Sequence, residues 1–254
     1  MQERIIEELK AIEARHNVRV LYACESGSRA WGFPSHDSDF DVRFFYLRPR
    51  DWYLSIDGEH QRDVIEQPIA EALDISGWDF RKALGLFRKS NPPLLEWLDS
   101  PIVYSDNFGI AGQMRALMPQ IYSPTSSAYH YWQMARKNAA AYLKGDLVRA
   151  KKYFYVLRPL LAVRWIEAHQ SAPPTPFEKL LELLENEDLR AAIEDLMERK
   201  KHGLESDAEP RLEIFHQWIE AELERHENGF RFRETKSDIE PLNELFRATL
   251  KTVW

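Results

Sequence analysis

Cysteine is nearly absent from this chain of 254 residues, which contains only Cys24. A single cysteine forms no intrachain disulfide and builds no thiolate-rich metal site. Cys24 lies in an apolar run, and we interpret it as a small core residue. The eight histidines show neither an H-E-x-x-H motif nor paired spacing, which argues against a zinc site.

The N-terminus lacks a long hydrophobic run, because charged residues interrupt the helical pattern MQERIIEELKAIEARH. Signal peptides and membrane helices need such a run, so we expect a cytoplasmic protein with no membrane segment. An excess of positive charge is also missing, since the formal net charge is −7. Proteins that coat nucleic acid are usually basic over much of their surface, and only a local basic groove fits this composition.

Length and periodicity together predict two lobes. With 44% apolar residues, the chain has enough hydrophobic material for one large core or two modest ones. We expect an α/β (α+β) fold, with a small mixed sheet in a domain over residues 1–108 and a mostly helical domain over 109–254. Helical periodicity predicts helices over 126–143, 147–169, 176–185, 187–201 and 208–226. Residues 201–210 are expected to form an exposed, mobile loop.

The first lobe alternates apolar strands with helical patterns. The predicted elements are a helix over 2–15, strands over 18–23, 40–48, 62–69 and 71–76, and a helical pattern beginning after Gly77. Gly77 is expected to end the last of these strands.

Two aspartates share one face of the second predicted strand. Strand alternation puts Asp39 and Asp41 opposite the apolar residues Phe40, Val42, Phe44 and Tyr46. Their side-chain origins lie about 7 Å apart, given a rise of about 3.3 Å per residue. Carboxylates so placed can converge on two Mg²⁺ ions about 3.5–4 Å apart.

A glycine and a serine follow the first predicted strand. Gly27 lets the backbone approach phosphate oxygens closely, while Ser28 offers its hydroxyl and its N–H. Alone, a G-S pair is a common turn and a D-x-D pair is often a solvated strand face. In this order, ten residues apart, they predict a site that holds a triphosphate for in-line attack at the α-phosphorus.

Three stretches carry a family resemblance: ESGSRAWGFPSHDSDFDVRFFYLRP, LDISGWDFRKAL and KSNPPLLEWLDSPIVY. Over about residues 20–105 they resemble the DNA polymerase β-type nucleotidyltransferase superfamily, most of all the predicted nucleotidyltransferases of the RNA-repair-associated polymerase β family. The resemblance implies a third carboxylate on a later strand. Its best counterpart is Asp74, with Asp63 and Glu66 as rivals.

Cations and aromatic residues near these motifs leave alternatives open. Arg29 either reaches the triphosphate or faces solvent, and Trp31 and Phe33 either stack on a base or pack beneath their loop. In the helical half, Lys152 and Arg158 either bind phosphate across the nucleotide cleft or are simple surface charges.

The sequence therefore predicts a metal-dependent nucleotidyltransferase that uses Mg²⁺, or Mn²⁺, and a nucleoside triphosphate such as ATP. Asp39, Asp41 and Asp74 would hold the metals, and pyrophosphate would leave. The resemblance implies an RNA end as acceptor, while a protein side chain or a small molecule stays open. A non-catalytic nucleotide-sensing module, and a phosphatase or nuclease, are the alternative functions.

Overall fold

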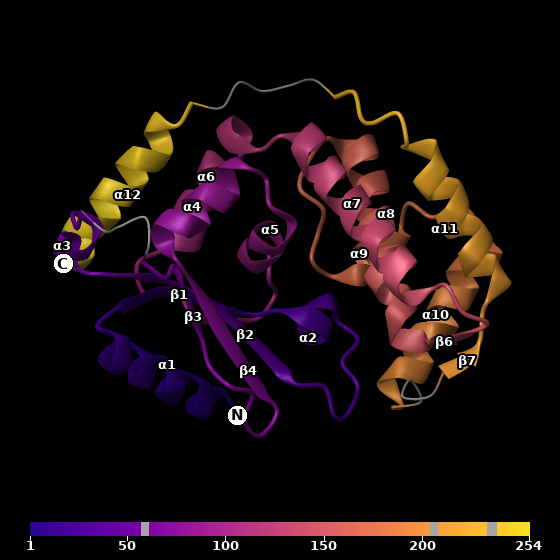
Figure 1. The fold of residues 1–254 in the computed structure, drawn as a ribbon, viewed down its shortest axis with the longest axis horizontal. Coiled ribbons are helices and arrows are strands. Elements are labelled where there is room, and N and C mark those ends of the chain that lie inside the picture. The colour runs from indigo at the N-terminus through magenta and orange to yellow at the C-terminus, as the bar shows by residue number, and fades with distance from the viewer. Residues whose placement is uncertain (57–60, 204–207, 233–237) are drawn as a thin grey trace. The chain divides into compact units, whose positions relative to one another are not determined.

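The computed structural model describes residues 1–56, 61–203, 208–232 and 238–254 (Figure 1). The chain divides into two compact units. The sheet unit comprises Met1–Gly27, Asp39–Tyr122 and Thr235–Trp254, and the helical unit comprises Ser28–Ser38 and Ser123–Glu234. None of the described helices is long and apolar enough to cross a membrane.

The sheet unit contains a five-stranded mixed sheet, as the sequence predicts. Its strands run in the order β3 (Val64–Glu66), β4 (Leu73–Asp79), β2 (Phe40–Leu47), β1 (Arg19–Glu25) and β5 (Val103–Ser105). Only β2 and β4 pair in parallel, while the other neighbours are antiparallel. The predicted strand over 62–69 is reduced to the three residues of β3.

Helices cover both faces of this sheet (Figure 1). On one face, helix α1 (Gln2–His16) packs its apolar stripe of Ile5, Leu9 and Ile12 against a cluster that includes Phe44 and Tyr46. On the other face lie α4 (Phe80–Arg88), α5 (Pro92–Leu98) and α6 (Ile110–Ile121). The alternation predicted for β2 is confirmed, because the next residue along, Phe45, contacts Trp97 of α5 at 5.7 Å between ring centroids.

Gly77 does not end the strand as expected, since β4 continues through it to Asp79. A Cβ atom at Gly77 would lie 2.3 Å from the Phe44 ring on the neighbouring strand. Such an approach is closer than van der Waals contact permits, so the glycine makes room for an aromatic side chain. The sequence shows the glycine but not the neighbour that requires it.

The C-terminal helix α12 (Glu240–Val253) belongs to the sheet unit, although the expected boundary between 108 and 109 assigns it to the helical half. Phe246 of α12 lies 5.1 Å from the Tyr53 ring and 6.2 Å from the Phe80 ring. Tyr53 ends the short helix α3 (Arg50–Tyr53), and Phe80 begins α4. Helix α6 also belongs to the sheet unit, although it follows the expected boundary.

The helical unit is built around α8 (Ala150–His169), whose residues are buried on most sides. Around it lie α7 (Pro124–Tyr142), α9 (Phe177–Leu181), α10 (Glu187–Lys201) and α11 (Glu213–Arg225). The predicted helices over 147–169 and 208–226 both start too early, because 147–149 and 208–210 pair as the strands β6 (Leu147–Arg149) and β7 (Ala208–Pro210). Of the predicted loop over 201–210, residues 204–207 lie outside the described residues.

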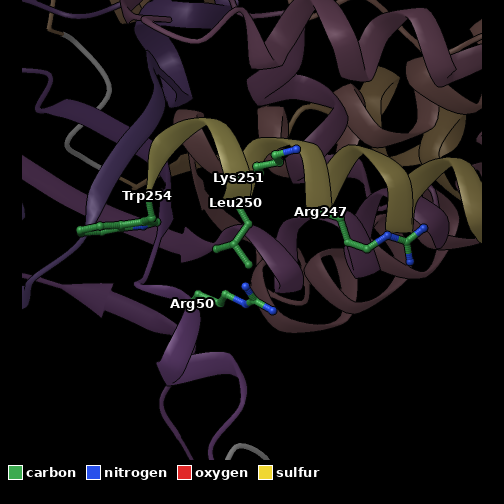
Figure 2. A pocket seen from close by; sticks show the side chains of 5 residues that line it. All are labelled: Arg50, Arg247, Leu250, Lys251 and Trp254. Atoms are coloured by element: carbon green, nitrogen blue, oxygen red, sulfur yellow. The ribbon is translucent and has the colours of Figure 1, made fainter.

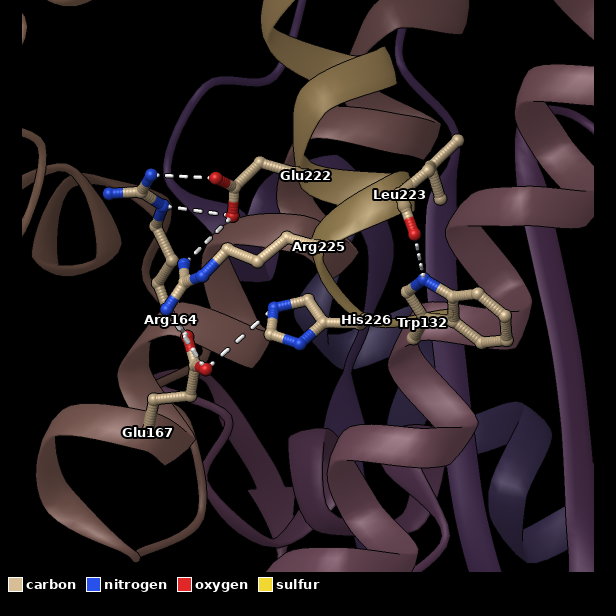
Figure 3. A network of polar contacts seen from close by, with 7 residues as sticks. All are labelled: Trp132, Arg164, Glu167, Glu222, Leu223, Arg225 and His226. Carbon is tan, nitrogen blue, oxygen red and sulfur yellow. Dashed lines mark hydrogen bonds and ion pairs between the residues drawn. The ribbon is translucent and has the colours of Figure 1, made fainter. Parts of the chain in front are cut away.

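A polar network joins α8 to α11 in the helical unit (Figure 3). Arg164 donates from Nη2 and Nε to the two carboxylate oxygens of Glu222, at 2.7 and 3.0 Å. Arg225 donates to both oxygens of Glu167, at 3.0 and 2.9 Å. His226 Nε2 lies 3.7 Å from Glu167 Oε1, and its ring stacks on Phe230 at 4.7 Å.

Candidate active site

Asp41 and Asp74 are cross-strand neighbours. The parallel register of β2 and β4 pairs Asp41 with Asp74, so both side chains point to the same face of the sheet. Asp39 is exposed just before β2 begins. The register thus places Asp74 directly beside Asp41, the second aspartate of the D-x-D pair.

The two rivals of Asp74 are engaged with other residues. Asp63 accepts from Lys82 Nζ at 2.8 Å, and Glu66 accepts from Arg62 Nη2 at 2.5 Å. Glu66 lies on β3 opposite Ser76 of β4, one strand further from Asp41. Of the three candidates, Asp74 alone is paired in register with Asp41.

Arg43 lies between the two aspartates. Its Nη2 donates to Asp41 Oδ1 at 3.1 Å and to Asp74 Oδ2 at 2.7 Å. Its Nη1 donates to the backbone carbonyls of Val42 and Asp74, at 3.0 and 3.1 Å. Sequence reasoning assigned no role to Arg43, although alternation places it on the face of Asp41; the missing information was the strand pairing that brings Asp74 within reach.

The backbone of Asp41 is fixed by the end of β1. Asp41 N–H donates to Glu25 Oε1 at 2.7 Å, and Asp41 C=O accepts from Ser26 N–H at 2.8 Å. Glu25 is fully buried, and its second carboxylate oxygen accepts from the Tyr104 hydroxyl on β5. Glu25 thus links β1, β2 and β5 at the position of Asp41.

Gly27 is required by the Asp41 carboxylate. A Cβ atom at Gly27 would lie 2.1 Å from Asp41 Oδ2, and the glycine has a φ of +58°, which L side chains rarely adopt. The absent side chain therefore leaves room for a carboxylate. The sequence predicted a different reason for this glycine, namely close approach of a phosphate to the backbone, and that role stays a prediction.

Negative charge exceeds positive charge around Asp41. Burial raises the pKa of the Asp41 carboxyl above its usual range, Arg43 opposes the shift, and the Asp74 and Asp39 carboxylates add to it. Carboxylate oxygens are the ligands that Mg²⁺ prefers, and one or two of them with substrate phosphates complete a typical site. The donor chemistry fits such an ion. Within the described ranges no three His, Cys, Asp or Glu side chains form a metal site by themselves.

Ser28 lies in a short helix and belongs to the helical unit. Helix α2 (Gly27–Trp31) begins at the junction, and Ser28 Oγ donates to Ser38 Oγ at 3.2 Å. Arg29 Nη2 donates to the Ser38 carbonyl at 2.7 Å, so Arg29 closes the ends of its own loop. Phe33 is fully buried, and its ring centroid lies 4.7 Å from that of Phe154. Of the two roles considered for Phe33, packing beneath the loop therefore holds, and stacking on a base does not.

The two cations of α8 differ in their surroundings. Lys152 Nζ lies 3.9 Å from the Tyr142 ring and 4.7 Å from the Tyr155 ring, and burial lowers the pKa of its ammonium group. Arg158 is only 2% exposed; it donates to the Thr175 carbonyl at 3.3 Å, and its guanidinium lies 4.9 Å from the Trp31 ring. Arg158 is therefore no simple surface charge. Phosphate binding by either residue stays a prediction.

Comparison with known proteins agrees with the resemblance over nearly the whole chain. The family model for RlaP, the RNA repair pathway DNA polymerase beta family, matches residues 1–248. The uncharacterized protein YcgL of Bacillus subtilis (strain 168) is 52% identical over 257 residues, covering 100% of this chain and 98% of that protein. The crystal structure of a nucleotidyltransferase-like protein from Exiguobacterium sibiricum 255-15 is 10% identical, with a TM-score of 0.33, over 87% of this chain and 73% of that one. That structural likeness is too distant to support an argument.

Proposed function

Because this chain belongs to the RNA repair pathway DNA polymerase beta family, we propose that it transfers a nucleoside monophosphate from a nucleoside triphosphate to an acceptor hydroxyl and releases pyrophosphate. The observation that supports this chemistry most directly is the in-register pair of Asp41 and Asp74, with Asp39 two residues before Asp41. Oxygen ligands on one sheet face suit divalent cations that neutralise transferring phosphates.

Asp39, Asp41 and Asp74 would hold Mg²⁺ or Mn²⁺. When bound, the metal ions would neutralise charge on the triphosphate and favour loss of the acceptor's hydroxyl proton. Asp74 is 29% exposed and can accept that proton. Arg43 keeps Asp41 and Asp74 paired, and Glu25 fixes the Asp41 backbone, so the carboxylates are positioned before substrate arrives.

The triphosphate tail is assigned to the backbone N–H groups and hydroxyl at Gly27 and Ser28, which suit anionic oxygens. Lys152 and Arg158 are further proposed phosphate contacts. Lys152 lies over an aromatic ring, and Arg158 lies over another ring and donates to the Thr175 carbonyl. These surroundings do not suit a catalytic base, so each residue would contribute its positive charge.

We propose an RNA end as the acceptor, following the description of the family. The test is incubation of the protein with each α-³²P-labelled nucleoside triphosphate, Mg²⁺ or Mn²⁺, and RNA, protein or small-molecule acceptors. We expect label on RNA with the wild-type chain and with Glu66→Gln, and none with Asp39→Ala or Asp74→Asn. Glu66→Gln is the matched control, because Glu66 is an acidic residue of the same sheet that pairs with Arg62.

The outcomes separate the parts of the proposal. Label on a protein or a small molecule would change the acceptor and keep the chemistry. Nucleotide binding without transfer to any acceptor would favour a sensing module. Equal activity in Asp39→Ala, Asp74→Asn and the wild type would remove the carboxylates from the mechanism.

A further inference from the structure

Helix α12 is bordered by two hollows on the sheet unit. The first has a volume of about 460 Å³ and lies between the C-terminal half of α12 and the start of α3 (Figure 2). Arg50 faces the helix there, and the Leu250 side chain points toward it. The second has a volume of about 430 Å³ and lies between α4 and the N-terminal half of α12.

Both hollows combine cations with apolar surface. The first is lined by Arg50, Arg247, Leu250, Lys251 and Trp254. The second has Arg81, Arg88 and Lys89 beside an apolar floor that includes Leu242 and Phe246. Among the described residues, no carboxylate side chain lines either hollow, although the whole chain has a formal net charge of −7.

Most of these cations are available to a ligand. Across the described part of the chain, the side chains of Arg50, Arg88, Lys89 and Lys251 form no hydrogen bond or ion pair, and all four are exposed. Arg247 pairs with Glu240. Exposed cations gathered on one surface attract anionic ligands.

We propose that this surface, formed by α12 with Arg50 and the cationic end of α4, binds a single strand of RNA. The cations contact successive phosphates, while Trp254 and the apolar floor contact bases, as in sites where aromatic rings alternate with positive charge. The inference rests on the proposed function for the identity of the strand as the acceptor.

The dimensions favour a strand over a free nucleotide. The 14 residues of α12 span about 21 Å at 1.5 Å per residue, with a hollow beside each half. At about 3.4 Å per nucleotide, roughly six nucleotides cover that length. Asp41 lies near the start of β2, about 20 Å from the end of the strand at 3.3 Å per residue, and Arg50 follows that end. The strand would thus be held at a distance from the reacting end.

The test measures binding of a fluorescent single-stranded RNA of roughly 12 nucleotides, twice the length that α12 spans. It uses the full chain without nucleotide or metal, at several salt concentrations. The variant Arg50→Gln/Arg88→Gln/Lys251→Gln removes three cations of this surface. The control Lys10→Gln/Lys137→Gln/Lys179→Gln removes three exposed cations elsewhere and changes net charge equally.

We expect the first variant to weaken binding at least tenfold and to reduce the slope of log K against log salt by about 2, since each phosphate contact contributes about 0.7 on single strands. The control should change affinity by less than about twofold, since it leaves these contacts in place. Equal losses in the two variants, absence of RNA binding by the wild type at low salt, or equally effective competition by polyglutamate would each overturn the inference. Because RNA binding is measured without turnover, its result does not depend on whether the chain transfers nucleotides.

Discussion

Each unit of the molecule contains arginine bonded to carboxylates, and the two clusters differ in charge balance and burial. In the helical unit, two arginines face two glutamates, and Glu222 is only 5% exposed (Figure 3). In the sheet unit, one described arginine, Arg43, pairs with Asp41 and Asp74, which are 28% and 29% exposed.

The difference is the one expected between a structural cluster and a candidate active site. Glu222 accepts from Arg164 through both oxygens, so its charge is compensated inside the fold. The sheet cluster retains more negative charge than its arginine neutralises and is reached by solvent. Such a partly compensated site costs stability by itself and becomes favourable when a cation binds. Breaking each cluster should therefore affect different properties.

The largest effect is expected from Asp41→Asn, which removes a carboxylate from the sheet cluster and keeps its shape. Nucleotidyl transfer should fall about a thousandfold, because the charge that a metal ion neutralises is worth several kcal/mol and each 1.36 kcal/mol is tenfold. Single-turnover rates measure the loss. A thermal melt should show the fold intact, since the amide fits where the carboxylate lies beside Gly27. A rate within tenfold of the wild type would contradict the assignment of Asp41.

Glu222→Gln should show the opposite pattern. It leaves the Arg164 guanidinium without its carboxylate in a partly buried position, so the unfolding free energy should fall by about 3 kcal/mol. Urea denaturation measures this change, and transfer by the folded fraction should be unaltered. If Glu222→Gln slows transfer while stability holds, the helical cluster is more than structural.

Gly27→Ala tests whether the sheet cluster depends on a missing side chain. Gly109→Ala is the matched control, because Gly109 has a φ of +62° but nothing within 4 Å of its added Cβ. Both variants should lose about 1 kcal/mol for the left-handed backbone. Gly27→Ala should lose about 1–2 kcal/mol more for the contact with Asp41, and transfer should fall in this variant alone. Equal stability and equal activity in the two variants would mean that the carboxylate moves aside freely.

The sequence predicts the elements of the sheet cluster better than their arrangement. Period-two alternation over 40–47 identifies the face of Asp41, because one side of the strand must be apolar to pack under α1. That Asp74 lies beside Asp41 depends on the parallel register of β2 and β4, which no local pattern contains. Arg43 was missed for the same reason, since its role requires both strands.

Tertiary packing also explains what the sequence could not show elsewhere. Helix α12 is not among the helices predicted from periodicity, and the aromatic contacts of Phe246 with Tyr53 and Phe80 join it to the sheet unit. Similarly, Gly27 and Gly77 are visible as glycines, while the side chains they make room for come from other strands. The proposed function follows from the order of the motifs, whereas these packing contacts are visible only in the structure.

The smallest effect concerns His226, which lies beside the helical cluster and is 4% exposed. Burial lowers the pKa of its imidazole below the ordinary value of 6.5; Glu167 and Glu222 oppose the shift, while Arg225 and Arg164 add to it. The unfolded chain therefore gains a proton first as the pH falls through 6.5, so the contribution of His226 to stability is present above that pH and is lost below it.

Urea denaturation at about pH 7.5 and about pH 5.5, on either side of the ordinary value, should show a smaller acid loss of stability in His226→Gln than in the wild type. His202→Gln, at an exposed histidine, should keep the full loss. An acid loss in His226→Gln as large as that of the wild type would show that His226 does not cause it.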